Sequence, residues 1–371
     1  MEVKRHGLRI LQVVRQFLPR TGGMQEYVAQ LSRHLINLGH EVDVLTLNRN
    51  IHTGESLGDD SSVFFKDQNI FVKRVAFRGW SRFFWVPSLG LCLKDYDIVH
   101  VHGVDGFLSA VMRFSDIPLF LSTHGGYFHT SKLRMLKNIF FHTRTRFQLR
   151  NVLKVLACSR QDFFKFKSIC DNVELVENGV DVDYFRPKQV RELKLNNWLY
   201  VGGFESNKQV HRLLQAFDHC HRHHSNLSLT IVGTEQFSGQ WKELTRGLNS
   251  KKSINFFSNL SSEELLKLYH CSGLFVSASE YEGFGLASME ALASGSLLML
   301  HPNQSFLDLF CGLGEFADFE RPDKVLEAFN LISSMNEKDL IQRAAFGLAK
   351  SEIFSWKKVA REIENHYFNS T

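Results

Sequence analysis

The feature that most constrains the fold is a strand, glycine loop, helix and strand pattern at the start of the chain. The apolar run 8–14 is typical of a buried strand, and the loop after it ends at Gly22 and Gly23. Residues 24–38 then repeat apolar side chains at helical spacing and stop at a glycine. A second apolar run, 41–47, follows at once. This unit predicts an α/β fold with a parallel, doubly wound sheet.

The same alternation recurs along the chain and indicates two domains. At 371 residues, with 44% hydrophobic and 22% charged residues, the chain is long enough for two cores. Further strands are predicted at 97–102, 119–123, 154–158 and 173–176 and, after a charged linker at 189–197, at 198–201, 227–232, 254–256, 274–277 and 296–300. We therefore place domains at 1–187 and 188–354, followed by an amphipathic helical segment at 355–371.

Composition indicates the cellular compartment and the kind of partner. The six cysteines include no C-x-x-C pair, which favours free thiols in a reducing compartment. No signal peptide is expected, and no apolar run reaches the roughly 18 residues of a bilayer-spanning helix. The net charge of +5 suits an anionic partner, such as nucleotide phosphates, lipid headgroups or nucleic acid. No nucleic-acid motif and no Walker A loop accompanies it, so nucleic acid is not expected as a partner.

The strongest functional pattern is the segment 279–295, S-E-Y-E-G-F-G-L-A-S-M-E-A-L-A-S-G. It places Glu282 and Glu290 eight positions apart around a Gly-Phe-Gly turn that leads into an apolar helix. The first N–H groups of such a helix are unpaired and carry partial positive charge, which suits a phosphate. Two acceptor side chains beside an anion site fit a sugar nucleotide. Taken alone, E-x7-E also fits an ordinary loop with acidic residues at a solvated helix start.

With the glycines, the aromatic residue and the Ala-rich helix taken together, the sequence resembles a family 4 glycosyltransferase of the GT-B fold. The resemblance spans nearly the whole chain and implies two Rossmann-like domains facing across a cleft, with the C-terminal helix returning to the first domain. It also implies that Glu282 lies near the donor sugar and that Glu290 binds the nucleotide ribose. The backbone of Phe284, Gly285 and Leu286 would hold the phosphates.

A second segment, V-G-G-F-E-S-N-K at 201–208, opens the second half. The family carries an arginine just after the first glycine and a lysine five residues later, both on the diphosphate. Lys208 matches that lysine, whereas Gly203 stands where the arginine is expected. Either another basic residue substitutes, of which Arg212 is one, or the phosphates depend more on Lys208 and the helix dipole.

In the first half, glycines and histidines follow predicted strands. Gly22 and Gly23 would let backbone amides approach the donor phosphates or the acceptor, although a tight turn without a ligand is the alternative. His124, at the carboxyl end of a strand, resembles the family histidine that faces the donor sugar; a structural histidine is the alternative. We interpret His100 and His102 as facing opposite sides of their strand, hence as poor metal partners. His102 is the better candidate for lining the cleft.

Several patterns that resemble metal sites are interpreted otherwise. D-x-D occurs at 181–183 and 95–97, but the first is expected to form a turn and the second precedes a strand rather than following one. The histidine-rich run 219–224 has ligands too close in sequence to close a tetrahedral site, and it predicts a solvated helix end. No metal cofactor is expected.

The segment 132–154 predicts a surface that rests on a membrane. It contains phenylalanines, no acid and seven cations: Lys132, Arg134, Lys137, Arg144, Arg146, Arg150 and Lys154. Such a patch gains about 1 kcal/mol per cation near anionic lipid, and a solvated basic face is the alternative. We expect a cytoplasmic protein that is peripheral on the cytoplasmic face of the inner membrane.

Within the family, the runs at 15–19, 123–130 and 281–285 resemble bacterial mannosyltransferases of exopolysaccharide assembly, which use GDP-mannose and a polyprenyl-diphosphate oligosaccharide. The resemblance implies a retaining hexosyltransferase with those substrates. No residue stands out as a nucleophile, and the resemblance implies front-face attack within an ion pair. Catalysis is then expected to be electrostatic, with domain closure that excludes water.

Three alternatives stay open at this point. The donor could be a UDP-sugar, because the loop 301–306 lacks the Gly-Gly common in the wider family. A sugar-nucleotide epimerase can share the GT-B architecture, although an epimerase of soluble nucleotides needs no lipid surface. A non-catalytic partner would explain the missing arginine at Gly203, whereas the intact glutamates, lysine and histidine oppose it.

Overall fold

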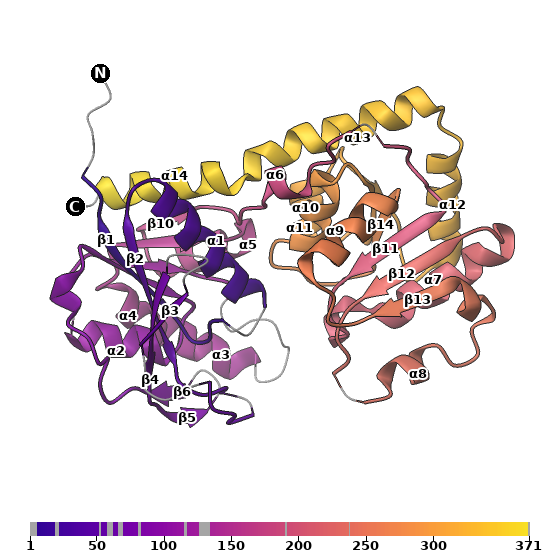
Figure 1. The fold of residues 1–371 in the computed structure, drawn as a ribbon. Coiled ribbons are helices and arrows are strands. Elements are labelled where there is room, and N and C mark those ends of the chain that lie inside the picture. The colour runs from indigo at the N-terminus through magenta and orange to yellow at the C-terminus, as the bar shows by residue number, and fades with distance from the viewer. Residues whose placement is uncertain are drawn as a thin grey trace, which may run out of the picture. The chain divides into compact units, whose positions relative to one another are not determined.

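The computed structural model describes residues 6–18, 22–51, 53–57, 62–65, 70–80, 83–114, 117–125, 134–189, 191–236 and 238–369. The chain divides into two compact units (Figure 1). Unit 1 comprises residues 1–179 and 356–371, and unit 2 comprises 180–355. Residues 180–187, placed in the first domain above, are therefore part of unit 2.

Unit 1 is built on an eight-stranded sheet in the order β10-β9-β8-β7-β1-β2-β4-β3. All neighbouring strands are parallel except β3 and β4, so the predicted doubly wound sheet is confirmed. The strands are β1 (Arg9–Val14), β2 (Glu41–Leu47), β3 (Ser62–Phe65), β4 (Ile70–Val75), β7 (Ile98–His102), β8 (Leu119–Ser122), β9 (Lys154–Ala157) and β10 (Val173–Leu175). A separate antiparallel ribbon joins β5 (Arg78–Trp80) to β6 (Phe83–Trp85).

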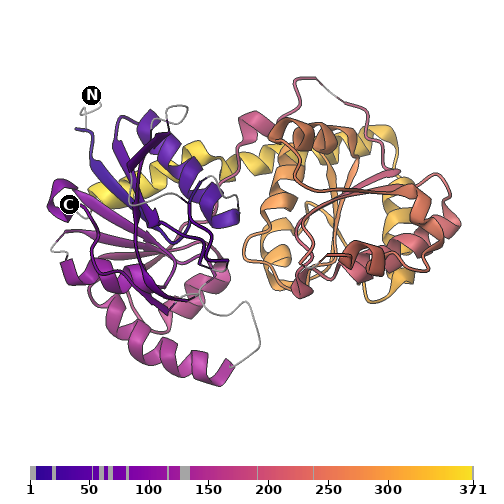
Figure 2. The same ribbon diagram turned by 60° about the horizontal axis from the view of Figure 1, so that its bottom comes forward.

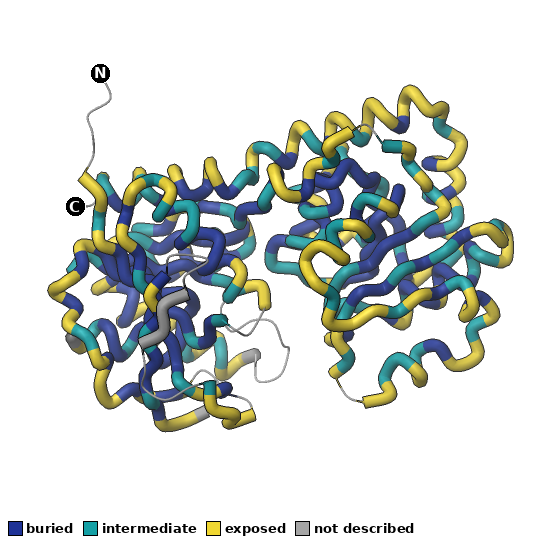
Figure 3. Tube along the Cα trace, viewed as in Figure 1, coloured by how far each residue is buried: buried dark blue, intermediate teal, exposed yellow. Residues whose placement is uncertain are grey.

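Helices cover both faces of this sheet (Figure 2). They are α1 (Gly23–Asn37), η2 (Leu93–Asp95), α2 (Gly106–Phe114), α3 (Arg134–Phe140), the π-helical turn η3 (Phe141–Thr145), α4 (Arg146–Leu149), α5 (Arg160–Lys167) and α14 (Trp356–Phe368). In Figure 3 the central strands are mostly dark blue and the outer helix faces yellow, because the apolar side chains of each layer meet at the sheet.

The C-terminal helix α14 belongs to unit 1. Trp356, Val359, Ile363 and Tyr367 recur at helical spacing and are buried in the same apolar cluster as residues of α1. The hydroxyl of Tyr367 lies 2.7 Å from Nδ1 of the buried His100 in β7. This contact ties the last helix to the middle of the sheet.

Unit 2 contains a six-stranded parallel sheet in the order β13-β12-β11-β14-β15-β16. The strands are β11 (Asn197–Val201), β12 (Ser228–Val232), β13 (Ile254–Phe257), β14 (Leu274–Ser277), β15 (Leu297–Leu300) and β16 (Glu315–Phe316). The helices are α6 (Val182–Phe185), η4 (Ser206–Lys208), α7 (Val210–His223), α8 (Gln240–Leu244), η5 (Asn249–Ser253), α9 (Ser262–Cys271), α10 (Leu286–Ala293), α11 (Gln304–Phe310), α12 (Pro322–Ser333), α13 (Glu337–Ser351) and η6 (Glu352–Phe354).

Both sheets reverse their strand order at one internal point. In unit 1 the first strand, β1, lies between β2 and β7, and in unit 2 β11 lies between β12 and β14. At such a point the connections that follow two neighbouring strands run to opposite faces of the sheet, which leaves a crevice at their carboxyl ends. The fold therefore points to the loops after β1 and β7, and after β11 and β14.

We predict that the Tyr367→Phe substitution destabilises unit 1. It would leave Nδ1 of the buried His100 without the hydroxyl that it now contacts. A buried polar atom without its partner costs about 1–3 kcal/mol, and denaturant unfolding should report a loss of that size. The matched control is Tyr184→Phe, at an exposed ring, with an expected change below about 0.5 kcal/mol. Equal losses in both variants would contradict the prediction.

Candidate functional site

In unit 2, the loops that follow β11 and β14 are joined by backbone and side-chain hydrogen bonds. The Glu280 N–H donates to the carbonyl of Asn207 at 2.9 Å, and the Asn207 side-chain amide donates to the carbonyl of Tyr281 at 3.0 Å. These loops leave adjacent strands at the reversal point of the sheet. The two sequence segments identified above thus lie side by side.

Lys208 and Glu282 form an ion pair across these loops. Lys208 Nζ lies 2.7 Å from Glu282 Oε1, and the two side chains are 23% and 14% exposed. Ser305, at the start of α11, donates from its hydroxyl to the Glu282 carbonyl at 2.7 Å. Next to Lys208, Gln209 has a positive φ of 51°, a conformation that non-glycine residues adopt mainly where the surrounding structure enforces it.

The Gly-Phe-Gly turn starts helix α10 in a way that requires glycine. Gly285 is the N-cap residue with φ 80°, and a Cβ there would lie 2.7 Å from the Phe306 ring. Phe284 is buried in the core of unit 2 and anchors the turn. The helix has no side-chain cap at this end. Its first amides therefore retain the partial positive charge that favours an anion.

Glu290 lies inside α10, one turn beyond the helix start. Its Oε2 accepts a hydrogen bond from the Tyr269 hydroxyl at 2.7 Å, which fixes the orientation of the half-buried carboxylate. Burial, reinforced by the Glu290 charge, raises the pKa of Tyr269 well above its ordinary value, so this hydroxyl stays a donor.

At Gly203, the carboxylate of Glu205 occupies the nearby space. A Cβ on Gly203 would lie 2.5 Å from Glu205 Oε2. Arg212, the other basic residue considered, pairs with Glu280 at 2.6 Å and with Glu320 at 2.8 Å. Arg212 therefore pairs with two carboxylates, whereas Lys208, on the joined loops, pairs with Glu282.

In unit 1, His124 follows β8 in a left-handed turn with φ 46°. Asp162 holds this turn: its Oδ2 accepts from the Thr123 hydroxyl at 2.5 Å and from the Gly125 N–H at 2.7 Å. Asp162 lies in the first turn of α5, where the Ser159 hydroxyl caps its N–H. A strained non-glycine backbone that is held by a buried carboxylate is typical of a functional turn.

The structure corrects the expectation that His100 and His102 face opposite sides of β7. Their ring centroids lie only 4.4 Å apart, because residues two apart on a strand project from the same face. His102 Nδ1 is 3.0 Å from His124 Nε2, and His102 Nε2 is 2.6 Å from Gln12 Oε1. The three histidines therefore form one cluster with tilted rings.

Burial keeps the three histidines of this cluster uncharged. It lowers the pKa of His100 and of His124 to about 3, and it moves the pKa of His102 well below its ordinary value. The second ring nitrogen of His124, Nδ1, lies 3.7 Å from the sulfur of Cys158. At neutral pH His124 is therefore a neutral imidazole with both nitrogens directed at neighbours within unit 1.

Gly22 and Gly23 lie at the start of α1, after β1. Gly22 is the N-cap residue, with an extended φ of 171°, and no side chain caps this helix end. A Cβ on Gly22 would meet only the end of the Gln25 side chain, at 2.7 Å. The backbone conformation at Gly22 therefore does not require glycine. Gly126, in the turn after His124, lies outside the described residues.

Sequence reasoning missed the residues that hold these groups in place. Tyr269 orients Glu290, Asp162 holds the His124 turn, and Ser305 supports the Glu282 carbonyl. Only the S-x-x-D pattern that begins at Ser159 marks one of them in the sequence, and it signals a helix cap rather than a supporting carboxylate.

No group of three or more His, Cys, Asp or Glu side chains in the described ranges is arranged to hold a metal. Asp181 of the first D-x-D caps α6 by accepting from the Tyr184 N–H at 3.1 Å. Asp97 of the second accepts from the Arg9 N–H at 2.8 Å. Both aspartates thus have structural partners.

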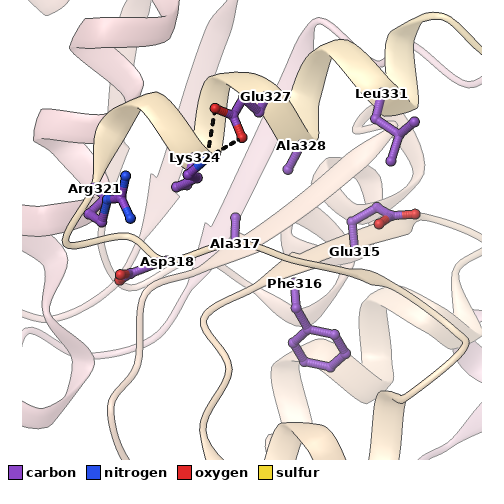
Figure 4. A pocket seen from close by; sticks show the side chains of 9 residues that line it. All are labelled: Glu315, Phe316, Ala317, Asp318, Arg321, Lys324, Glu327, Ala328 and Leu331. Atoms are coloured by element: carbon purple, nitrogen blue, oxygen red, sulfur yellow. Dashed lines mark hydrogen bonds and ion pairs between the residues drawn. The ribbon is translucent and has the colours of Figure 1, made fainter.

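A surface hollow of about 460 Å³ lies between β16 and α12 (Figure 4). Its charges are paired with one another or with neighbours: Lys324 contacts Glu327 at 2.6 Å, and Arg321 contacts Asp323 at 3.2 Å. It contains none of the predicted site residues, and we assign it no role.

The cationic segment predicted to face a membrane is described from Arg134 onward, Arg134 by its backbone only, while Lys132 lies outside the described residues. Arg144 on η3, Arg146 on α4 and Arg150 directly after α4 are exposed. No described helix is long and apolar enough to cross a bilayer.

The comparisons with known proteins cover both units. The family described as Glycosyltransferase Family 4 matches residues 21–184. The family described as Glycosyl transferases group 1 matches residues 181–345.

Curated relatives extend over nearly the full chain. A GDP-mannose:cellobiosyl-diphosphopolyprenol alpha-mannosyltransferase of Xanthomonas oryzae pv. oryzae is 29% identical, over 98% of this chain and 97% of that protein. A protein of the same description from Komagataeibacter xylinus is 28% identical, over 99% of this chain and 95% of its own.

Solved structures show the same fold. Sucrose-phosphate synthase from Thermosynechococcus elongatus matches with a TM-score of 0.76 at 17% identity, over 97% of this chain and 98% of its own. A glycosyltransferase from Rickettsia africae matches with a TM-score of 0.74 at 18% identity, over 98% and 99%. The chain therefore belongs to the glycosyltransferases of the GT-B fold, with a Family 4 first half and a group 1 second half.

Proposed function

We propose that this chain is a retaining mannosyltransferase that moves mannose from GDP-mannose to a saccharide carried on polyprenyl diphosphate. The observation that carries the proposal is the arrangement at the reversal point of unit 2, where Lys208, Glu282, the start of α10 and Glu290 occupy joined loops. The donor and acceptor are those in the names of relatives that are 28–29% identical over at least 97% of the chain.

Each part of the unit 2 site fits one part of a sugar nucleotide. The uncapped amides of α10, at Leu286 and its neighbours, together with Lys208, would bind the diphosphate, because both present positive charge. Glu290, oriented by Tyr269, would accept hydrogen bonds from the ribose hydroxyls. Glu282 would accept from the sugar hydroxyls.

The Lys208–Glu282 ion pair suggests how binding proceeds. When the diphosphate arrives, Lys208 exchanges its carboxylate partner for a phosphate oxygen, and Glu282 becomes available to the sugar. With Gly203 in place of the family arginine and Arg212 engaged by two carboxylates, Lys208 carries most of the side-chain charge against the leaving group. Catalysis then depends strongly on one lysine and the helix dipole.

The chemical step needs no protein nucleophile. The bond between the anomeric carbon and the diphosphate oxygen breaks, and a bond to the acceptor hydroxyl oxygen forms on the same face, while the hydroxyl proton passes to the departing phosphate. Retention follows from attack on the face that the diphosphate leaves. His124 of unit 1 is proposed to contact the donor sugar through Nδ1, which in this structure lies 3.7 Å from the Cys158 sulfur. It would do so as a neutral imidazole, because burial lowers its pKa to about 3. The amides at Gly23 are proposed to receive donor phosphate oxygens.

The membrane-facing segment fits an acceptor that is fixed in a lipid bilayer. Met135, Leu136, Ile139 and Phe147 are all more than half exposed on α3 and α4, among the exposed arginines of the same segment. Apolar side chains beside cations on one helical segment favour the surface of an anionic bilayer. We propose that unit 1 docks there through this segment, on the cytoplasmic face.

We predict that GDP and GDP-mannose raise the thermal midpoint of the wild-type protein, and that UDP, ADP and their sugars do so much less. A ligand that binds only the folded state must stabilise it by mass action. Glu290→Ala should weaken GDP binding about tenfold or more, because it removes charge-assisted hydrogen bonds to the ribose. Glu263→Ala, at an exposed position on α9, is the control. A shift with UDP-sugars alone would mean that the donor is a UDP-sugar rather than GDP-mannose. No shift with any nucleotide would contradict the proposed transferase activity.

A second prediction concerns Lys208. Lys208→Gln should lower kcat and kcat/KM for mannose transfer together, by about 100-fold or more, because it removes charge stabilisation of the leaving diphosphate. Initial rates with radiolabelled GDP-mannose and a lipid-linked disaccharide measure both constants. Lys251→Gln, at an exposed lysine of unit 2, should retain full activity. If kcat stays unchanged and only KM rises, Lys208 binds the donor but does not stabilise the transition state.

A further inference from the structure

Unit 1 contains a cavity that the donor chemistry does not use. Its volume is about 250 Å³, it is partly open to the surface, and it is lined by residues of the β5–β6 ribbon, the start of α2 and the helical segment α3-η3-α4. The side chains that matter here are Arg78, Phe83, Trp85, Phe140, Arg144 and Gln148.

The cavity lies at the carboxyl-end edge of the sheet. Helix α2 follows the end of β7 at His102, and the β5–β6 ribbon follows the end of β4 at Val75. In Figure 1 the ribbon and α3 lie at the same end of unit 1. Open parallel sheets bind their ligands at this edge, and the His124 turn leaves the same edge after β8. The position therefore suits a substrate of the enzyme.

Two arginines and one aspartate provide the charges that line the cavity. Arg78 and Arg144 have no ion pair with any carboxylate in the described part of the chain. The acid at the cavity, Asp105, accepts a hydrogen bond from the Phe107 N–H at 2.9 Å, a backbone group in the first turn of α2. Two arginines without acidic partners favour an anion with several oxygens, such as a diphosphate.

The remaining walls are aromatic and continue to the exposed segment. The Phe83 and Phe140 rings pack edge to face with centroids 5.6 Å apart, and Phe83 and Trp85 are 56% and 44% exposed. The Arg144 guanidinium lies 5.4 Å from the Phe140 ring centroid. The β5–β6 ribbon and the helical segment therefore each contribute an arginine and an aromatic ring, and the helical segment also carries the exposed Met135 and Leu136.

The helix geometry places Arg144 at this cavity. Residues Phe141–Thr145 form a π-helical turn inside an otherwise α-helical segment, and such turns frequently mark functional sites. The buried Gln148, one turn further on, donates to the Ser109 hydroxyl at 2.7 Å and fixes the segment against α2. Arg146, two residues beyond Arg144, is exposed and does not line the cavity.

We propose that this cavity binds the diphosphate and the first isoprene units of the lipid-linked acceptor. Arg78 and Arg144 take the phosphate oxygens, and Phe83, Trp85 and Phe140 contact the hydrocarbon. The proposal rests on the function proposed above, since it concerns the acceptor of that reaction. It assigns the lipid end of the acceptor to a defined cavity of unit 1.

The test uses farnesyl diphosphate as the probe, with farnesol and inorganic diphosphate as separate arms, and measures binding to the full chain by isothermal titration. Farnesyl diphosphate should bind at least about tenfold more tightly than either part alone, because the cavity offers both cations and apolar rings. Arg144→Gln and Arg78→Gln should each weaken binding about tenfold or more, and Phe83→Ser should also weaken it.

Arg146→Gln is the matched control, because it removes the same charge from the same helical segment without touching the cavity. It should change binding less than about twofold if the cavity is the site. Equal effects of Arg144→Gln and Arg146→Gln would show attraction to general surface charge and overturn the proposal. Tighter binding of cellobiose than of farnesyl diphosphate, with loss in Phe83→Ser, would make the cavity a saccharide site and also overturn it.

The outcomes separate this proposal from the proposed function. A wild-type protein that binds GDP and transfers mannose but does not bind farnesyl diphosphate overturns the cavity assignment alone. A protein that binds farnesyl diphosphate but no nucleotide supports the cavity and overturns the donor assignment. The GDP-induced thermal shift should be unchanged in all four variants, which also verifies that each is folded.

Discussion

The arrangement of unit 2 depends on the contact between the loops that leave β11 and β14. Because the two strands are adjacent and parallel while their following helices run to opposite faces, their carboxyl ends open a crevice. The Lys208–Glu282 ion pair spans the two loops with a separation of 2.7 Å. Asn303, at the start of α11, donates to the Ser279 carbonyl at 2.8 Å and adds a third loop. The charged groups of the site are thus fixed by the sheet rather than by loop sequence alone.

In unit 1, polar side chains at the sheet edge are buried and need hydrogen-bond partners within the protein. His100, His102 and His124 form one cluster, and burial lowers their pKa values, so these three side chains carry no imidazolium charge at neutral pH. Their ring nitrogens are within hydrogen-bonding distance of Tyr367, Ser122, Gln12 and one another. A buried polar group is tolerated when its partners are present, and helix α14 supplies one of them.

The two units separate the chemical tasks. Unit 2 presents a helix start and a single lysine, which suit the compact charge of a nucleotide diphosphate. Unit 1 presents exposed arginines interleaved with aromatic rings on α3, η3 and α4, which suit an anion that carries a hydrocarbon. This division agrees with a reaction between a dissolved donor and an acceptor anchored in a membrane. The loss of the arginine at Gly203 makes the donor side depend on fewer cations than the resemblance implied.

The sequence by itself determined the α/β class and most strands of both sheets, and it singled out the two segments whose Lys208 and Glu282 form an ion pair in the structure. It could do so because strand and helix periodicity are local, and because Gly285 must be glycine where φ is positive and Phe306 is near. It missed β4, whose run Ile70–Val75 includes the buried Arg74, and it placed His100 and His102 on opposite faces although their spacing puts them on one.

Only the tertiary structure decided which residues support the site. Tyr269 reaches Glu290 across 21 positions of sequence, and Asp162 reaches Thr123 across 39. No local pattern encodes such contacts, because they arise when parallel strands bring distant loops to one edge of a sheet. The same reason explains why the cavity between β5, β6, α2 and α3 was not foreseen, whereas the cations of its helical segment were. The sequence specified the cations of the helical segment, whereas packing determined which of them line the cavity.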